Sequence, residues 1–146
     1  MTKNKLEKLF GKTLKNVDYW GIKLHNNPLA HQATPADYIL YRYNRLVMLE
    51  CKLVTCKEGK GRFAFNRLTQ LHDLLAFENH CPKFDSYLCL AFYDKRWANS
   101  EIYIIPISAF DDFMYNINTK SVNRKVAKES FFGYSVKVVK GVIQWQ

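Results

Sequence analysis

Residues 34–53 read Thr-Pro-Ala-Asp-Tyr-Ile-Leu-Tyr-Arg-Tyr-Asn-Arg-Leu-Val-Met-Leu-Glu-Cys-Lys-Leu, and this stretch decides the fold. Two runs rich in Ile, Leu, Val, Met and Tyr flank the short polar segment 43–45, a pattern typical of two strands joined by a turn. Side chains alternate along a strand, so Glu50 and Lys52 are expected on one face and Cys51 on the other. The sequence therefore predicts a β-hairpin whose second strand carries two charges within an apolar run.

Asp37 opens the first strand of this hairpin. In an antiparallel pair the start of one strand lies beside the end of the other, so Asp37, Glu50 and Lys52 are expected to meet at one end of the sheet. Charges beside a core cost several kcal/mol unless they are compensated. Two adjacent carboxylates repel each other unless a cation lies between them, and hard oxygen ligands favour Mg²⁺. A lysine at the rim of such a site can hold a phosphate or help to orient a water.

The spacing from Asp37 to Glu50-Cys51-Lys52, with twelve residues between, resembles the PD-(D/E)xK nuclease signature, with Pro35-Ala36-Asp37 as its first part. Within that superfamily the chain most resembles the RecU-type Holliday junction resolvases, over roughly residues 5–115. Those enzymes continue with a polar loop, an aromatic-containing run and a helix that carries a Gln. This chain has Lys57-Glu58-Gly59-Lys60-Gly61-Arg62, then Phe63-Ala64-Phe65, then Gln70.

The resemblance implies an α/β fold with a restriction-endonuclease-like core, in which a central mixed sheet is flanked by helices. It implies catalytic roles for Asp37, Glu50, Lys52 and Gln70. Asp37, Glu50 and the backbone carbonyl of Cys51 would bind Mg²⁺, with Mn²⁺ able to substitute. Glu7, on a helix at residues 2–16, is a further candidate ligand, although a solvated glutamate paired with a nearby lysine explains it equally well. The expected DNA-binding residues are Lys57, Lys60, Arg62 and Arg67.

The function implied is paired nicking of branched DNA, the four-way Holliday junction of recombination and repair, by a homodimer. In RecU-type enzymes the connection equivalent to residues 25–33 is a longer stalk, and here it is short. Two alternatives stay open at this point. The chain could be another PD-(D/E)xK endonuclease that acts on linear or damaged duplex, or a nucleic-acid-binding module without catalysis.

Composition agrees with a polyanionic partner. The 146 residues include 22 Lys and Arg against 13 acidic residues, a net charge of +9, and 48% are hydrophobic. This length predicts one nuclease domain over residues 1–146 with a sizeable core. No apolar run approaches a membrane span and no signal sequence is visible, so we expect an intracellular protein in the cytoplasm of a prokaryotic cell or a phage-infected host. The four cysteines lack zinc spacing and are expected to be reduced, with Cys51 and Cys89 on buried strand faces.

Periodicity predicts the remaining elements. Expected helices are 2–16, 66–79 with Asn66 as N-cap, and 108–116. Expected strands outside the hairpin are 17–24, 86–93, 102–107 and an edge strand at 136–140. The intervening segments are a mobile basic loop at 55–62, a polar stretch at 94–99 and a basic segment at 120–128.

Overall fold

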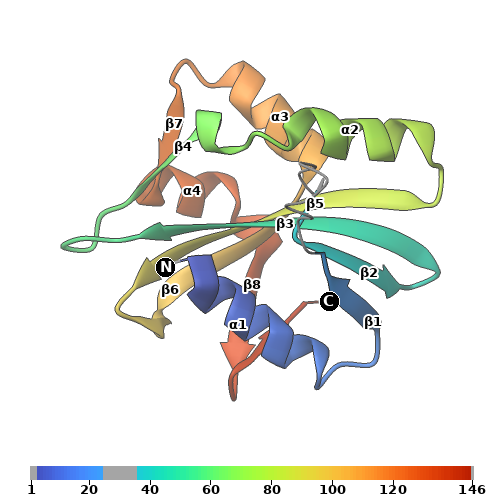
Figure 1. The fold of residues 1–146 in the computed structure, drawn as a ribbon. Coiled ribbons are helices and arrows are strands. Elements are labelled where there is room, and N and C mark those ends of the chain that lie inside the picture. The colour runs from blue at the N-terminus through green and yellow to red at the C-terminus, as the bar shows by residue number, and fades with distance from the viewer. Residues whose placement is uncertain (1–2, 25–35, 146) are drawn as a thin grey trace, which may run out of the picture.

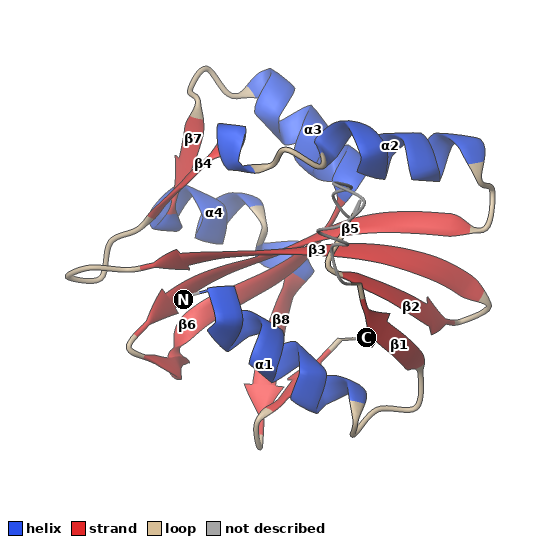
Figure 2. Cartoon of the chain, viewed as in Figure 1, coloured by secondary structure: helices blue, strands red, loops and turns tan. Residues whose placement is uncertain are grey.

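The structure, a computed structural model, describes residues 3–24 and 36–145. Its elements in chain order are α1 (Lys3–Leu14), β1 (Trp20–Lys23), β2 (Tyr38–Arg42), β3 (Arg45–Thr55), β4 (Arg62–Ala64), the 3₁₀ helix η1 (Phe65–Arg67), α2 (Leu71–His80), β5 (Phe84–Asp94), β6 (Arg96–Pro106), α3 (Ile107–Asn116), β7 (Ser121–Asn123), α4 (Arg124–Ser130), η2 (Phe132–Tyr134), β8 (Ser135–Val139) and β9 (Val142–Gln144). Figure 2 colours these elements by type.

A mixed sheet organises the described part of the chain. Its strand order is β1-β2-β3-β5-β6-β8-β9, and β4 pairs with β7 in a separate small ribbon. β3 and β5 run parallel, whereas the other neighbours in the sheet run antiparallel. A parallel pair needs a crossover connection, which α2 supplies between β3 and β5. The predicted α/β architecture with a central mixed sheet flanked by helices is confirmed.

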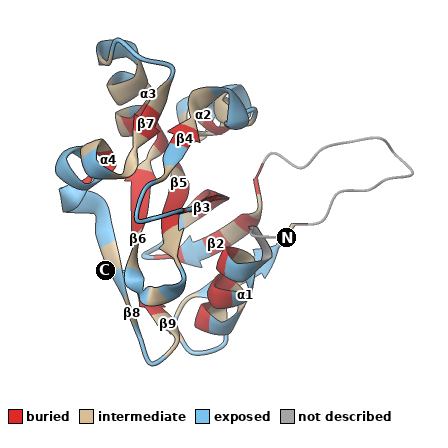
Figure 3. Cartoon of the chain, turned by 90° about the vertical axis from the view of Figure 1, so that its left-hand side faces the viewer, coloured by how far each residue is buried: buried red, intermediate tan, exposed pale blue. Residues whose placement is uncertain are grey.

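The helices cover both faces of this sheet (Figure 1). α1 lies on one face, where Leu6, Leu9 and Phe10 join a core with Leu49 and Cys51 of β3. α2, α3 and α4 lie on the other face, over a core that includes Met48, Val54 and Leu88. The buried residues, red in Figure 3, run through the central strands because these are covered on both sides. No helix in the described residues combines the length and apolarity that crossing a membrane requires.

The β2–β3 hairpin forms as predicted. Tyr43 and Asn44 connect the strands with positive φ angles of 50° and 60°, as a two-residue type I′ turn requires. Asn accepts this conformation more readily than most residues. The resulting register pairs Tyr38 with Leu49 and Leu40 with Val47, and all four side chains face the core beneath α1.

The helix predicted at 66–79 begins later than expected. Asn66 lies within η1, and α2 starts at Leu71, so Asn66 is not its N-cap. Leu68 leaves the helical region at ψ 70° and is 5% exposed. Burial of this side chain in the core therefore interrupts the helical pattern, and Gln70 takes the N-cap position of α2 rather than a place in its first turn.

The polar stretch 94–99 is also different from the prediction. β5 and β6 extend to Asp94 and Arg96 and turn at Lys95, whose φ is 66°. The rings of Tyr93 and Trp97 pack with centroids 4.8 Å apart, which stabilises the extended hairpin.

The C-terminal part contains elements that the sequence did not indicate. The basic segment 120–128 holds β7 and most of α4, and the Asn123 side chain caps that helix by accepting a hydrogen bond from Val126 N at 2.8 Å. β8 lies between β6 and β9, so the prediction of an edge strand at 136–140 was wrong. The unpredicted β9 forms the edge instead.

Candidate active site

The candidate site lies where β2 begins beside the middle of β3. Asp37 N donates to Leu49 O at 3.0 Å, and one Asp37 carboxylate oxygen accepts a hydrogen bond from Cys51 N at 2.8 Å. Because Cys51 N is joined to the Glu50 Cα through one peptide unit, the Asp37 carboxylate lies within about 6 Å of that Cα atom. The structure thus brings Asp37 to the backbone of the Glu50-Cys51-Lys52 segment, as predicted, but in the middle of β3 and not at the strand end, because β3 continues to Thr55.

Glu50 and Lys52 form an ion pair on the face of β3 that α2 covers. The Lys52 ammonium lies 2.9 Å from a Glu50 carboxylate oxygen, and the two side chains are 11% and 1% exposed. Their neighbours on β5 are Leu88 and Leu90. Two charges among leucines are costly to bury, so this ion pair is not by itself a source of stability.

Cys51 separates the two charged residues and faces the opposite core. Its thiol is fully buried next to Cys89, and a hydrogen bond to Cys89 together with burial raises the pKa of Cys51 well above its usual value. The thiol is therefore neutral. All four cysteines in the described residues are free, and the expected burial of Cys51 and Cys89 is confirmed.

The backbone carbonyl of Cys51 points toward Asp37. The N–H and C=O groups of one residue lie on the same side of a strand, and the Cys51 N–H donates to the Asp37 carboxylate.

Arg67 lies at the same edge of β3. Its guanidinium donates to Leu53 O at 3.1 Å and stacks 5.3 Å from the centre of the Phe63 ring. Leu53 is two residues beyond Cys51, which corresponds to about 6.6 Å along the strand. The Arg67 guanidinium therefore lies beside β3, two residues further along the strand than the Cys51 backbone that bonds Asp37.

Gln70 follows Arg67 by three residues at the start of α2, and its side-chain oxygen is buried without a hydrogen-bond partner in the described residues. A buried amide oxygen without a partner is costly. The catalytic role of Gln70 stays a prediction.

Glu7 lies on α1, on the other face of the sheet. Its carboxylate pairs with Lys23 at 3.3 Å, and its backbone carbonyl accepts the Tyr38 hydroxyl at 3.0 Å. Tyr38 is adjacent to Asp37, and burial is the main cause of its raised pKa, to which Cys51, Glu7 and Asp37 add. Glu7 is thus close to the end of β2 but paired with a lysine, as the alternative interpretation anticipated, although with Lys23 of β1. Its role as a metal ligand stays a prediction.

The predicted DNA-binding residues of the 57–62 segment lie beyond the end of β3. Lys57 and Lys60 face each other across a tight turn, with Lys57 N to Lys60 O at 2.8 Å and Lys60 N to Lys57 O at 2.9 Å. Arg62 donates to the Ser121 hydroxyl at 2.8 Å. This segment is hydrogen bonded at both ends of its turn, whereas the sequence had suggested a mobile loop. The connection at 25–33 and residues Thr34 and Pro35 lie outside the described residues.

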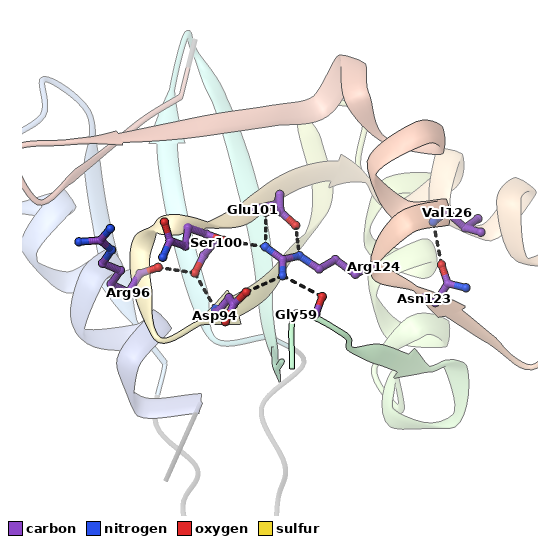
Figure 4. A network of polar contacts seen from close by, with 9 residues as sticks. Gly59, Asp94, Arg96, Ser100, Glu101, Asn123, Arg124 and Val126 are labelled. Carbon is purple, nitrogen blue, oxygen red and sulfur yellow. Dashed lines mark hydrogen bonds and ion pairs between the residues drawn. The ribbon is translucent and has the colours of Figure 1, made fainter. Parts of the chain in front are cut away.

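Sequence reasoning missed Arg124, which joins three separate parts of the chain (Figure 4). It contacts Glu101 at 2.6 Å, Asp94 at 2.8 Å and the carbonyl of Gly59 at 3.0 Å. Hydrogen bonds that Arg124 donates to Glu101 raise the pKa of Arg124 further above its usual range, with burial acting against this and Asp94 adding to it. No local signal in the sequence marks this arginine, because all three partners are distant along the chain.

The donor atoms at the head of β2 fit a hard divalent cation. The Asp37 and Glu50 carboxylates and the Cys51 carbonyl are all oxygen donors, the type that Mg²⁺ and Mn²⁺ prefer. Within residues 3–24 and 36–145, however, no group of three His, Cys, Asp or Glu side chains converges on one point. A site here would therefore rely on two carboxylates and a backbone oxygen, the ligand set predicted from the sequence.

Comparison with solved structures supports this fold assignment. The chain resembles the Holliday junction resolvase Hjc of the archaeal hyperthermophile Archaeoglobus fulgidus, with a TM-score of 0.53, 13% sequence identity and an alignment that covers 89% of this chain and 96% of that one. At this identity the likeness shows a shared fold. No protein-family model matches the sequence, and no curated protein is significantly similar to it.

Proposed function

We propose that this chain is a metal-dependent DNA endonuclease whose substrate is the four-way junction. One observation carries the proposal: the Asp37 carboxylate is bonded to Cys51 N, directly beside a buried ion pair between Glu50 and Lys52. Carboxylates, a backbone oxygen and a lysine are the groups that phosphodiester hydrolysis with a metal ion needs. The resemblance to a junction resolvase in fold supports the choice of substrate.

Each residue of the site has a distinct task in this reaction. Asp37, Glu50 and the Cys51 carbonyl would hold Mg²⁺, with Mn²⁺ able to replace it. When bound, such an ion lowers the pKa of the attacking water and neutralises charge on the phosphate. The Lys52 ammonium lies beside the Glu50 carboxylate. During the reaction it would contact the scissile phosphate and stabilise the negative charge that develops there.

Arg67 and Gln70 would complete the site from the start of α2. The Arg67 guanidinium lies at the β3 edge beyond Cys51 and can anchor a neighbouring phosphate. The buried oxygen of Gln70 can accept a hydrogen bond from the attacking water. Paired nicks require two such sites, so the proposed active species is a homodimer.

The decisive experiment compares substrates. The protein is incubated with Mg²⁺ and either an end-labelled immobile four-way junction or a linear duplex of the same sequence. We expect paired nicks in the junction, far less cutting of the linear duplex, and no cutting with a chelator. Light scattering of the complex should give two chains for each junction.

Three results would contradict parts of the proposal. Equal cutting of both substrates would exclude junction specificity and favour a general endonuclease. Paired nicking by a species that remains monomeric on the junction would exclude the homodimer. Tight DNA binding without cutting, with either Mg²⁺ or Mn²⁺ present, would leave a nucleic-acid-binding module without catalysis.

A further inference from the structure

A basic cleft lies away from the carboxylates, between the 57–62 segment and the start of α4. Its volume is ≈ 900 Å³, and every charged side chain that lines it is a cation: Lys57, Lys60, Arg62, Arg124, Lys125 and Lys128. Lys125 and Lys128 were not among the residues that sequence reasoning assigned to DNA. They face the predicted cations from a part of the chain more than 60 residues away.

The charges in this cleft differ in how they are compensated. Arg124 is paired with Asp94 and Glu101, so it adds little net charge. None of the lysines at 57, 60, 125 and 128 forms an ion pair with a carboxylate of the described residues. All four of these lysines are exposed. The cleft therefore presents several uncompensated positive charges to solvent, which is the footprint of a polyanion site.

The wall formed by the 57–62 segment is held in place. Glu58 and Gly59 have φ angles of 53° and 76°, as in a type I′ turn, and Arg124 N donates to Gly61 O at 2.9 Å. The Arg124 side chain adds its bond to Gly59 O. Arg124 is thus a positioning residue, which fixes the lysines of the turn relative to those of α4. A preorganised site loses less conformational entropy on binding than a mobile loop.

The position of the cleft relative to the candidate active site defines which part of the DNA would reach it. β3 carries Lys52 and leads toward Lys57, five residues later, a span of about 16 Å along an extended chain. The B-DNA rise is about 3.4 Å per base pair, so this span corresponds to about five base pairs.

We propose that this cleft binds the phosphate backbone of a DNA duplex arm, about five base pairs from the phosphate positioned by Asp37, Glu50 and Lys52. The separation of about five base pairs rests on the proposed function, because it is measured from the phosphate at the candidate active site. The binding of a duplex backbone rests only on the charge and shape of the cleft. The acidic turn tip at Glu58 lies outside the cleft lining and would face away from the DNA.

The first test measures duplex binding as a function of salt, in a chelator so that no cutting occurs. Each phosphate contact makes the slope of log affinity against log salt more negative by about 0.9. Lys125→Ala combined with Lys128→Ala should therefore make the slope less negative by about 1.8. The matched control, Lys137→Ala with Lys140→Ala, removes the same charge from β8 and the turn that follows it, and should leave the slope unchanged.

The second test locates the contact. Neutral methylphosphonate linkages four to six base pairs from the phosphate that the wild-type protein cuts with Mg²⁺ should weaken binding of the wild-type protein and have little further effect on the Lys125/Lys128 variant, because coupled changes are not additive. Equal weakening in both proteins would overturn the proposed location. An unchanged salt slope in that variant, an equal change in the control, or tighter binding of a matched RNA duplex would overturn the DNA-backbone site.

These results are separable from the fate of the nuclease proposal. If the protein never cuts DNA but the variant shows the expected change in salt slope, the cleft is supported as a DNA-binding site and the proposed nuclease function is excluded. If the protein cuts junctions but the Lys125/Lys128 variant binds with an unchanged salt slope, the nuclease function is supported and the cleft is excluded as a DNA-binding site.

Discussion

The Asp37 carboxylate accepts a hydrogen bond from the backbone N–H of Cys51 at 2.8 Å, where β2 no longer supplies a backbone partner to β3. A side chain thus continues the hydrogen bonding of the sheet beyond the last backbone pair. The same bond holds a carboxylate beside Glu50. The Asp37 side chain therefore both completes the hydrogen bonding of the sheet and supplies a carboxylate to the proposed metal site. Suitable substitutions can separate these two roles.

Asp37→Asn should separate the two roles. The asparagine oxygen can still accept from Cys51 N, so the free energy of unfolding should change by less than about 1 kcal/mol. Removal of the negative charge should reduce junction cutting by about 100-fold or more while DNA binding persists, because metal binding and charge neutralisation fail. Asp37→Ala should in addition destabilise the fold by about 1–3 kcal/mol, since Cys51 N–H is left without an acceptor. Urea unfolding and nicking rates measure both effects, and retention of full activity in Asp37→Asn would remove this residue from catalysis.

Lys52→Met tests the buried ion pair. It leaves the Glu50 carboxylate, 1% exposed, without its ammonium at 2.9 Å, and should destabilise the metal-free protein by about 3–5 kcal/mol. Glu50→Gln together with Lys52→Met should recover most of that loss, because neither charge of the ion pair remains to be buried, but should not recover cutting. Denaturant unfolding of the single and double variants in a chelator gives the coupling energy. A coupling near zero would show that the pair contributes nothing to the fold.

Arg124→Ala should affect a region distant from the carboxylates. Its loss leaves Asp94 and Glu101, which are 19% and 16% exposed, without their cation, so we expect a destabilisation of about 2–3 kcal/mol, below the fully buried value because solvent screens these groups. Hydrogen exchange should become faster within 57–61, where the Gly59 contact is lost. Lys125→Ala, one residue along the same helix and exposed, is the control and should be neutral in stability. Unchanged exchange at 57–61 would exclude the positioning role of Arg124.

The hairpin and the placement of its charges could be predicted because alternation along a strand determines which residues share a face. The start of α2 could not, since it depends on burial of Leu68 in a core built from distant strands. β9 has three residues and too little pattern to be recognised, although it covers the edge of β8. The cleft beside α4 could not be predicted from the sequence, because residues 57–62 and 123–128 are brought together by the pairing of β4 with β7 and by the bonds of Arg124 to Gly59 and Gly61.

Thr13→Val tests how the C-terminal strand is attached. Thr13 is fully buried; its hydroxyl donates to Leu9 O at 2.8 Å and accepts from Ile143 N at 2.9 Å, which ties α1 to β9. Valine keeps the shape but removes the acceptor, so the Ile143 N–H loses its partner, and we expect a destabilisation of about 1–3 kcal/mol. Thr13→Ser, the matched control, keeps the hydroxyl and should cost about 0.8 kcal/mol for the lost methyl group. Urea unfolding gives both values, and amide exchange at Ile143 should accelerate in the valine variant alone. Equal exchange in the two variants would show that β9 is held by its pairing with β8 and by packing, not by the Thr13 hydroxyl.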